Sequence, residues 1–270
     1  MKQPDIGKMA FDQLEILAQA RLVPPPSSRI PGFGMADAYA VAAEIVRLRR
    51  ARGERTAGRK IGFTNLSTWA RHGLDTPIWA HIYEGTVRFA ANDAAALPLA
   101  GMALPRIEPE IVFGLAKAPA GNDERSMLAA VEWLALGFEV VDCHFPGWRF
   151  TPADGVVDFG LHAKLLIGTP LPVTGKNADK LIGQLKEFRV KLLCNGELKE
   201  EGVGENVLGS PLLSLRHLAQ VIGNHTAEPL APGETITTGM LTAAPDIRAG
   251  ETWMAEVQGI DLSPLRLDLA

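Results

Sequence analysis

Apolar residues in the first fifty positions repeat at the spacing of amphipathic helices. Those between residues 11 and 18 share one face of a predicted helix, and those between 38 and 48 share one face of a second. A proline-rich connector at 23–28 separates the two helices. A short third helix is predicted at 67–72. The pattern therefore predicts a mainly helical cap over residues 1–75.

The rest of the chain consists of short apolar runs separated by glycine, proline, asparagine and aspartate. A helix is predicted at 126–136, followed directly by a buried strand. Residues 188–192 alternate between apolar and polar side chains. The Asn-Gly pair at 195–196 then predicts a hairpin, because a type I′ turn needs two residues that tolerate positive φ. Serine and proline at 210–211 open a predicted helix that Gly223 closes.

Many strands joined by few crossover helices indicate an α+β protein, with residues 76–270 forming a β-rich catalytic core. The chain has 270 residues, 47% apolar content and a net charge of −4, so neither nucleic acid nor a membrane surface is an expected partner. Its two cysteines imply no disulfide framework. The N-terminus lacks a signal-like apolar segment, and no apolar run approaches about 20 residues. We therefore expect a cytoplasmic protein.

Three carboxylates interrupt apolar runs that otherwise predict strands. Glu108 and Glu110 flank Pro109, and residues two apart in a strand point to the same face, so both can reach one point in space. Glu139 is predicted at the start of a buried strand. Buried carboxylates are costly unless paired, and Mg²⁺ takes oxygen ligands from a few carboxylates. A metal site is one interpretation; a solvated strand face, which Pro109 favours as a residue typical of edge strands, is the other.

Lys60 and a hydroxyl-rich loop are further candidates for chemistry. Glycines at 58 and 62 flank Lys60, and an apolar setting can lower the pKa of a lysine, which would fit it to bind a substrate carboxylate or move a proton. The alternative is a surface lysine in a turn. The loop 237–242 follows a predicted strand and offers N–H and O–H donors to an anionic oxygen.

Taken in order, these segments resemble the 2-hydroxypentadienoate (2-keto-4-pentenoate) hydratase and 4-oxalocrotonate decarboxylase family, within the fumarylacetoacetate hydrolase-like superfamily. The resemblance covers roughly residues 38–269. Its strongest matches are Gly58-Arg59-Lys60-Ile61-Gly62-Phe63-Thr64, Arg106-Ile107-Glu108-Pro109-Glu110-Ile111, Phe138-Glu139-Val140-Val141, Val157-Asp158, Leu208-Gly209-Ser210-Pro211 and Thr238-Gly239. It implies a mixed-sheet, rolled or barrel-like core with an N-terminal helical segment.

The resemblance also implies a site. Mg²⁺ or Mn²⁺ would be held by Glu108, Glu110 and Glu139, and a small 2-oxo acid would chelate it through the C1 carboxylate and the C2 oxygen. A metal on the 2-oxo group stabilises the enolate formed as protons move along the conjugated chain. Lys60 and Asp158 are implied as catalytic residues, with Lys60 as acid/base or carboxylate partner. The implied substrate-binding residues are Ile78, Trp79, His162, Thr238 and Gly239.

The implied activity is that of a lyase that hydrates a 2-hydroxy-2,4-dienoate from aromatic meta-cleavage catabolism. Hydratases of the family usually carry an acid where this chain has Ile78, which looks more like the decarboxylases. Decarboxylation of an unsaturated 2-oxo dicarboxylate is therefore an alternative. Cleavage of a C–C bond in an acylpyruvate is another, with His81 and Glu84 as the nearby groups for activating water. Phe159, where the family often has asparagine, implies a different substrate pocket.

The resemblance bears on assembly as well. Related decarboxylases and hydratases associate with one another, so a binding or assembly partner without turnover is a non-enzymatic alternative. Edge strands and family habit predict a homo-oligomer, and association with another enzyme of the same pathway is also expected. The length of the substrate and the choice between Mg²⁺ and Mn²⁺ stay open at this point.

Overall fold

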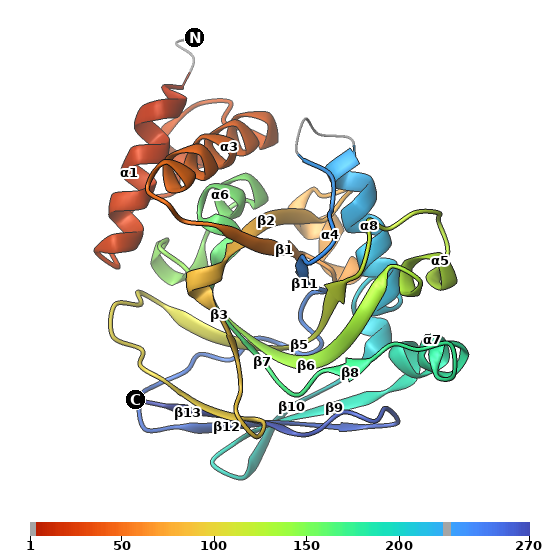
Figure 1. The fold of residues 1–270 in the computed structure, drawn as a ribbon. Helices are drawn as coiled ribbons and strands as arrows, with labels where there is room; N and C mark the ends of the chain where they lie inside the picture. Colours follow the sequence, from red (N-terminus) through yellow and green to blue (C-terminus); the bar gives the residue numbers. More distant parts are fainter. Residues whose placement is uncertain (1–3, 224–227) are drawn as a thin grey trace.

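The computed structural model describes residues 4–223 and 228–270, and two β-sheets form its centre (Figure 1). The larger sheet has the order β2 (Ile78–Tyr83), β1 (Thr56–Gly62), β11 (Thr235–Thr237), β5 (Pro105–Leu115), β6 (Val131–Asp142), β7 (His162–Ile167) and β3 (Val87–Phe89), with β8 (Leu171–Pro172) beside β6. The smaller sheet has the order β10 (Glu197–Val203), β9 (Arg189–Cys194), β12 (Thr252–Gln258), β13 (Leu265–Leu269) and β4 (Ala94–Leu97). The larger sheet curls strongly, and the smaller one lies across its convex side (Figure 1).

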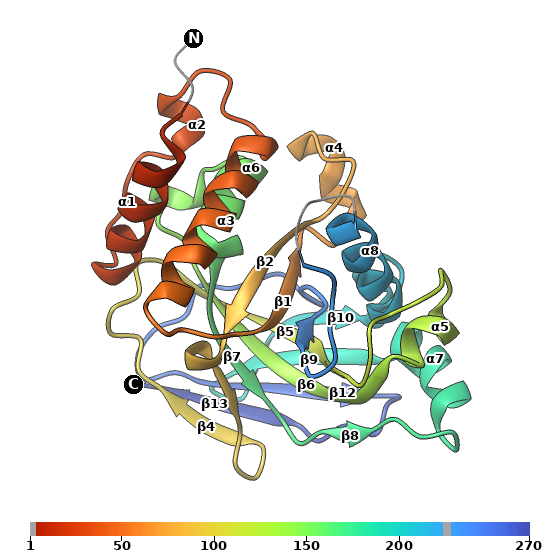
Figure 2. The ribbon, with the colours of Figure 1, turned by 45° about the horizontal axis from the view of Figure 1, so that its top comes forward.

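Helices pack in two groups around the sheets (Figures 1 and 2). The first group is α1 (Ile6–Ala18), α2 (Pro26–Arg29), α3 (Met35–Ala51) and α6 (Pro152–Val157). The second is α5 (Glu124–Leu128), α7 (Ala178–Glu187) and α8 (Pro211–Gly223), and the short α4 (Trp69–His72) follows β1. The helices of the first group pack around an apolar core of their own, which also includes Ile78 of β2 and Phe159, just after α6. The helical segment therefore closes over β1 and β2.

Most predicted elements are present. The helices expected in the first fifty residues are α1 and α3, and α8 runs from Pro211 to Gly223 as predicted. Asn195 and Gly196 join β9 to β10 with φ values of 51° and 82°, which is the positive-φ geometry that the Asn-Gly pair predicted. The mixed α+β class with a curled sheet is confirmed. No described helix is long and apolar enough to cross a membrane.

The helix predicted at 126–136 is wrong. The helix α5 ends at Leu128, and β6 begins at Val131, so Glu139 lies toward the end of its strand rather than at the start. Tertiary pairing overrides local propensity here, because β6 pairs with β5 from Val131 to Asp142. Trp133 fits against Gly114 on β5, where an added Cβ would come within 2.1 Å of the indole.

Pro109 does not mark an edge strand, because β5 lies between β11 and β6 in the larger sheet. Proline is tolerated because β11 pairs only with Val112–Gly114, so the backbone at Pro109 lies beyond that ladder. Leu241 N–H donates to Pro109 O at 3.1 Å instead. The proposed boundary between a cap of residues 1–75 and a core of 76–270 stays a prediction, and β1, on its N-terminal side, belongs to the larger sheet.

The alternation along β5 and β6 explains why acids interrupt these strands. The residues on one face, such as Ile111, Phe113, Leu136 and Phe138, join the core cluster that also holds residues of the smaller sheet. The opposite face is the concave side of the curl. Its floor is apolar, with Val112, Ala135 and Leu165 among the buried residues. The carboxylates lie on this concave face, at the ends of β5 and β6 beyond that floor.

Candidate metal centre

Sheet register brings the three predicted metal ligands together. Glu108 on β5 is the direct cross-strand partner of Glu139 on β6, so their side chains share a face, and Glu110 follows two residues later on that same face. Gly137 lies opposite Glu110 and leaves the space beside it free of a side chain. One carboxylate oxygen from each glutamate lies within 4.8 Å of the others. The predicted convergence is therefore found in the structure.

The solvated-face alternative does not fit the burial of these side chains. Glu110 and Glu139 are both 0% exposed, and Glu108 is partly buried. Gly239 N–H donates to Glu110 Oε2 at 2.8 Å. The other oxygen of Glu110, Oε1, and Oε2 of Glu139 have no hydrogen-bond partner among the described residues. Buried, unpaired carboxylate oxygens are unfavourable by themselves, so they point to a cation as the missing partner.

Lys60 lies on the same side of the curled sheet. It is 4% exposed, so the interpretation as a surface lysine in a turn is wrong. Its Nζ lies 3.1 Å from Glu139 Oε2, as an ion pair without the angles of a hydrogen bond. Burial alone would lower the pKa of Lys60, but Glu139, Glu108 and Glu110 outweigh it and raise that pKa. The lowered lysine pKa expected from an apolar setting is therefore not found.

Burial and the proximity of three carboxylates shift the pKa values of the glutamates. Burial, with Glu139 as a further cause, raises the pKa of Glu108 to about 7 despite Lys60. Burial and the two neighbouring carboxylates raise the pKa of Glu110 well above its ordinary value. Burial raises the pKa of Glu139 too, but Lys60 and His162 outweigh it and hold that pKa at about 2. An added positive charge at this point would favour the ionised form of all three.

The donor set fits a hard divalent cation. Three ionised carboxylates and one ammonium sum to a charge of −2, which one divalent cation neutralises. Carboxylate oxygens are the ligands that Mg²⁺ and Mn²⁺ prefer. Glu110 Oε1 and Glu139 Oε2 form no hydrogen bond among the described residues, and the cation near the second is Lys60 Nζ at 3.1 Å, so both can turn to a metal ion. We call Glu108, Glu110, Glu139 and Lys60 the metal centre.

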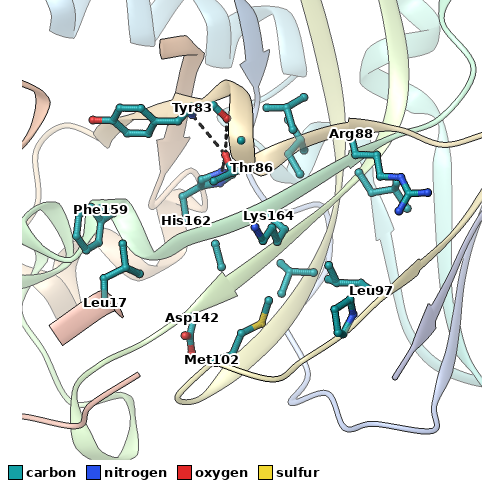
Figure 3. Close-up of a pocket in the computed structure, with 18 of the residues that line it drawn as sticks. Leu17, Tyr83, Thr86, Arg88, Leu97, Met102, Asp142, Phe159, His162 and Lys164 are labelled. Atoms are coloured by element: carbon teal, nitrogen blue, oxygen red, sulfur yellow. Dashed lines mark hydrogen bonds between the residues drawn. The ribbon is translucent and has the colours of Figure 1, made fainter. Parts of the chain in front are cut away.

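His162 contacts the predicted metal ligand Glu139. Its Nδ1 lies 2.8 Å from Glu139 Oε1, and its Nε2 lies 2.8 Å from Thr86 Oγ1. Thr86 Oγ1 also lies 2.7 Å from Tyr83 O (Figure 3). With the imidazole proton on Nδ1, His162 donates to Glu139 Oε1, and the Thr86 hydroxyl donates to Nε2 instead of to Tyr83 O. A donor on one oxygen of a ligating carboxylate fixes its orientation. Sequence reasoning missed Thr86, which lies 76 residues away along the chain and belongs to no motif.

The predicted contributions of Thr238 and Gly239 differ from each other. The hydroxyl of Thr238 donates to Ile111 O at 2.8 Å, so it is used within the fold. The amide of Gly239 serves Glu110. Gly239 has a φ of +100°, and a Cβ there would lie 2.2 Å from Thr64 Oγ1, so only glycine fits. Both residues stay predictions as substrate-binding groups.

Ile78 and Trp79 lie on opposite faces of β2. Ile78 pairs with Gly62 and Ala80 pairs with Lys60, so these side chains share the face of the metal centre. Trp79 points to the other face, where its ring stacks on Tyr39 with centroids 5.5 Å apart. The structure thus brings Ile78, but not Trp79, to the side of Lys60.

The water-activating candidates named from the sequence also lie away from Lys60. His81 is the partner of Arg59 in the β1–β2 register, so it points to the face opposite Lys60. Burial and then Arg59 lower the pKa of His81 to about 3. Glu84 is exposed and forms an ion pair with Arg55 at 2.9 Å. Neither group has access to the metal centre in this arrangement.

Asp158 belongs to a second buried polar cluster. It accepts hydrogen bonds from Gln13 Nε2 at 2.7 Å and from His144 N–H at 2.9 Å, and His144 Nδ1 lies 2.8 Å away. We call Asp158, His144 and Gln13 the His144 cluster; it ties α1 to the end of β6. The catalytic role predicted for Asp158 stays a prediction.

Neither of two large cavities is lined by a residue of the metal centre. The first, of about 650 Å³, has His162, Thr86 and Phe159 among its lining residues (Figure 3). The second, of about 540 Å³, is lined by small residues of α3 together with Ala80 and Phe159. Phe159 borders both. The residue that departs from the family pattern therefore lies at the boundary between these spaces.

Comparison with known proteins places the chain in a family. A 4-oxalocrotonate decarboxylase of Pseudomonas sp. (strain CF600) is 30% identical over 88% of this chain and 87% of its own length. A 2-hydroxyhexa-2,4-dienoate hydratase of Comamonas testosteroni is 29% identical over 91% of each. The sequence matches no protein-family model. The chain belongs to the 2-keto-4-pentenoate hydratase and 4-oxalocrotonate decarboxylase family, whose members are lyases.

Solved structures agree with this placement. The structure of 4-oxalocrotonate decarboxylase from Pseudomonas putida G7, complexed with magnesium and adipate, has a TM-score of 0.89 at 25% identity. The match covers 100% of this chain and 99% of that one. Members of the fumarylacetoacetate hydrolase family share the fold alone, at TM-scores of 0.53 to 0.56. The fold expected from the sequence resemblance is confirmed.

Proposed function

We propose that the protein is a Mg²⁺- or Mn²⁺-dependent lyase that hydrates a 2-hydroxy-2,4-dienoate. The observation that carries this proposal is the convergence of three buried glutamates on one face, with Lys60 Nζ 3.1 Å from Glu139. Such a centre suits a 2-oxo or 2-hydroxydienoic acid, which presents a carboxylate and an adjacent oxygen. The related hydratase named above acts on a substrate of this class.

The metal would be held by Glu108, Glu110 and Glu139, and it would act as a Lewis acid at the 2-oxo group. Lys60 is proposed to donate a proton to the conjugated chain, since its raised pKa keeps it protonated in the metal-free site. His162 holds Glu139 in place. The pairing of Lys60 with a glutamate also limits its side chain to one direction, toward the ligand set.

Decarboxylation of an unsaturated 2-oxo dicarboxylate is the second candidate, and Ile78 is the observation that favours it. Ile78 is 2% exposed and lies on the Lys60 face of β2, so an apolar side chain occupies the position of the usual hydratase acid. The related decarboxylase and the magnesium–adipate complex named above belong to this activity. Hydrolysis of an acylpyruvate has no such support, because His81 and Glu84 lie away from Lys60.

A side-by-side assay separates the two candidates. The Mg²⁺-loaded protein is given 2-hydroxypenta-2,4-dienoate and 2-oxohex-3-enedioate, and ultraviolet absorbance and CO₂ release are followed. Loss of the dienoate without CO₂ is the expected result. Release of CO₂ from the dicarboxylate would replace the hydratase proposal with the decarboxylase. No reaction with either substrate would contradict both candidate activities.

Location and assembly are proposals as well. We propose a cytoplasmic homo-oligomer that associates with another enzyme of the same pathway. The two cysteines, Cys143 and Cys194, are both unpaired thiols, which fits a reducing compartment. The strands β2 and β3 end the larger sheet among the described residues, and such edges are commonly covered by a partner. Light scattering of the purified protein tests the oligomer directly.

A further inference from the structure

Thr237, the last residue of β11, and Thr238, the residue after it, differ in what their hydroxyl groups contact. Thr237 and Thr238 are both 0% exposed. Thr238 Oγ1 donates to Ile111 O at 2.8 Å, whereas Thr237 Oγ1 has no hydrogen-bond partner among residues 4–223 and 228–270. A buried hydroxyl without a partner costs stability, so its retention calls for a role outside the fold of the free chain.

Sheet register places the Thr237 hydroxyl on the face of the metal centre. Thr237 on β11 is the register partner of Lys60 on β1 and of Val112 on β5. Register partners point to the same side of a sheet, and Val112 shares its side with Glu110. Thr237 therefore lies between the strand of the ammonium and the strand of two metal ligands. Two residues later, the amide of Gly239 holds Glu110.

The chemistry of the surroundings defines what this hydroxyl would meet. The glutamates beside it are acceptors, and the metal they would hold attracts anionic oxygens. A 2-oxo acid bound there brings carboxylate and enolate oxygens into the space bordered by Lys60. An O–H group desolvated before binding forms a strong charge-assisted hydrogen bond with such an oxygen.

We propose that Thr237 is a substrate-binding residue, whose Oγ1–H donates to an anionic oxygen of the bound 2-oxo acid. This inference rests on the proposed function, because it requires a 2-oxo acid in the site. Thr64 Oγ1 is also buried and has no hydrogen-bond partner within the described ranges, but Thr64 lies beyond the end of β1, outside the register that places Thr237. The assignment is therefore confined to Thr237.

The test compares Thr237→Val with Thr238→Val, which serves as a control for stability because the Thr238 hydroxyl is used within the fold. Oxalate serves as the probe, because it presents adjacent carboxylate oxygens like a 2-oxo acid. Calorimetry measures Mg²⁺ binding and then oxalate binding to the Mg²⁺-loaded protein, and thermal unfolding is followed on the metal-free form. Thr237→Val is expected to bind Mg²⁺ like the wild type, to bind oxalate about tenfold more weakly, and to unfold about 2 °C higher.

Thr238→Val is expected to unfold at a lower temperature, because it removes the hydrogen bond to Ile111 O. Wild-type oxalate affinity in Thr237→Val would overturn the role of Thr237 and leave the proposed function intact. A wild-type protein that binds Mg²⁺ but no oxalate would instead overturn the 2-oxo acid site, and the role of Thr237 with it. The two failures are thus distinguishable.

Discussion

Two buried polar clusters, the metal centre and the His144 cluster, look alike in the sequence and differ in the structure. Each places carboxylates within apolar stretches, and each lies at the end of β6. In the His144 cluster, both oxygens of Asp158 accept hydrogen bonds from Gln13 or His144. In the metal centre, Glu110 and Glu139 each keep one oxygen that forms no hydrogen bond with the part of the chain that the structure describes, although Lys60 Nζ lies 3.1 Å from that of Glu139.

The hydrogen bonds to the carboxylate oxygens thus distinguish a candidate metal site from a cluster that stabilises the fold. An acid whose acceptors are all used stabilises the fold, because its burial is offset by hydrogen bonds. Neighbouring Asp142 is of the same kind, since it accepts from the backbone N–H groups of Ala103 and Leu104. The three glutamates of the metal centre share one face, two of them have raised pKa values, and two keep an oxygen without a hydrogen bond among the described residues, which together point to a cation. Four predictions test this comparison, in order of expected effect.

Lys60→Met should reduce turnover by about 10²- to 10⁴-fold, the usual contribution of a positioned acid or base. Methionine keeps most of the buried volume while removing the ammonium. Steady-state rates measure the loss, and Mn²⁺ binding by electron paramagnetic resonance shows that the centre is still assembled. Turnover close to that of the wild type would remove Lys60 from the proposed chemistry.

His162→Gln should weaken Mg²⁺ binding about 10- to 100-fold, because Glu139 loses the donor that orients it. Calorimetry on the metal-free protein measures this affinity. Thr86→Val is the matched control, since it leaves the His162–Glu139 contact in place and should have a smaller effect. Equal losses in the two variants would contradict the direct role of His162.

Asp158→Asn should lower the free energy of unfolding by about 2 kcal/mol, since it disturbs the buried hydrogen bonds that Gln13 and His144 donate to this side chain. Urea unfolding measures the change. The same variant tests the catalytic role predicted from the family resemblance. Normal stability with lost turnover would place Asp158 in the chemistry and blur the distinction between the clusters.

The stability of the metal-free protein should fall as pH rises from 5 to 8. Folding raises the pKa of Glu108 to about 7 and raises the pKa of Glu110 well above its ordinary value of 4.5. The stability that these two groups contribute is therefore fully present below the unfolded-state pKa near 4.5, and it is lost as pH rises through their folded-state pKa values. The lowered pKa of Glu139 acts only at more acidic pH. Calorimetric melting with a chelator should show a decline on the order of 2–5 °C, and Mg²⁺ should remove it. A decline of the same size in Glu110→Gln would assign the effect to other groups.

Local patterns predicted much of this fold. The amphipathic spacing gave α1 and α3, and the Asn195–Gly196 turn was predictable because its chemistry is local. The segment 126–136 was not, because only residues 126–128 belong to a helix, α5, and residues 131–136 are held in β6 by pairing with β5. Only register, which no local pattern contains, decides which side chains meet.

The site divides in the same way. The convergence of Glu108 and Glu110 follows from strand periodicity. Glu139 and Lys60 were candidates because of their sequence surroundings, and the family resemblance gave them roles in the site. Thr86 and Thr237 could not be found, since their placement depends on strands far apart in the chain. Thr237 and Thr238 differ because the Thr238 hydroxyl donates to Ile111 O, a hydrogen bond that the sequence does not reveal.

A titration with Mn²⁺, followed by calorimetry, tests whether Glu108, Glu110 and Glu139 form a metal site. The wild type should bind one ion per chain, Glu110→Gln should lose at least about 100-fold in affinity, and Asp158→Asn should bind as the wild type does. That outcome would separate the two clusters as the structure does. Wild-type affinity in Glu110→Gln would contradict the assignment of the metal centre.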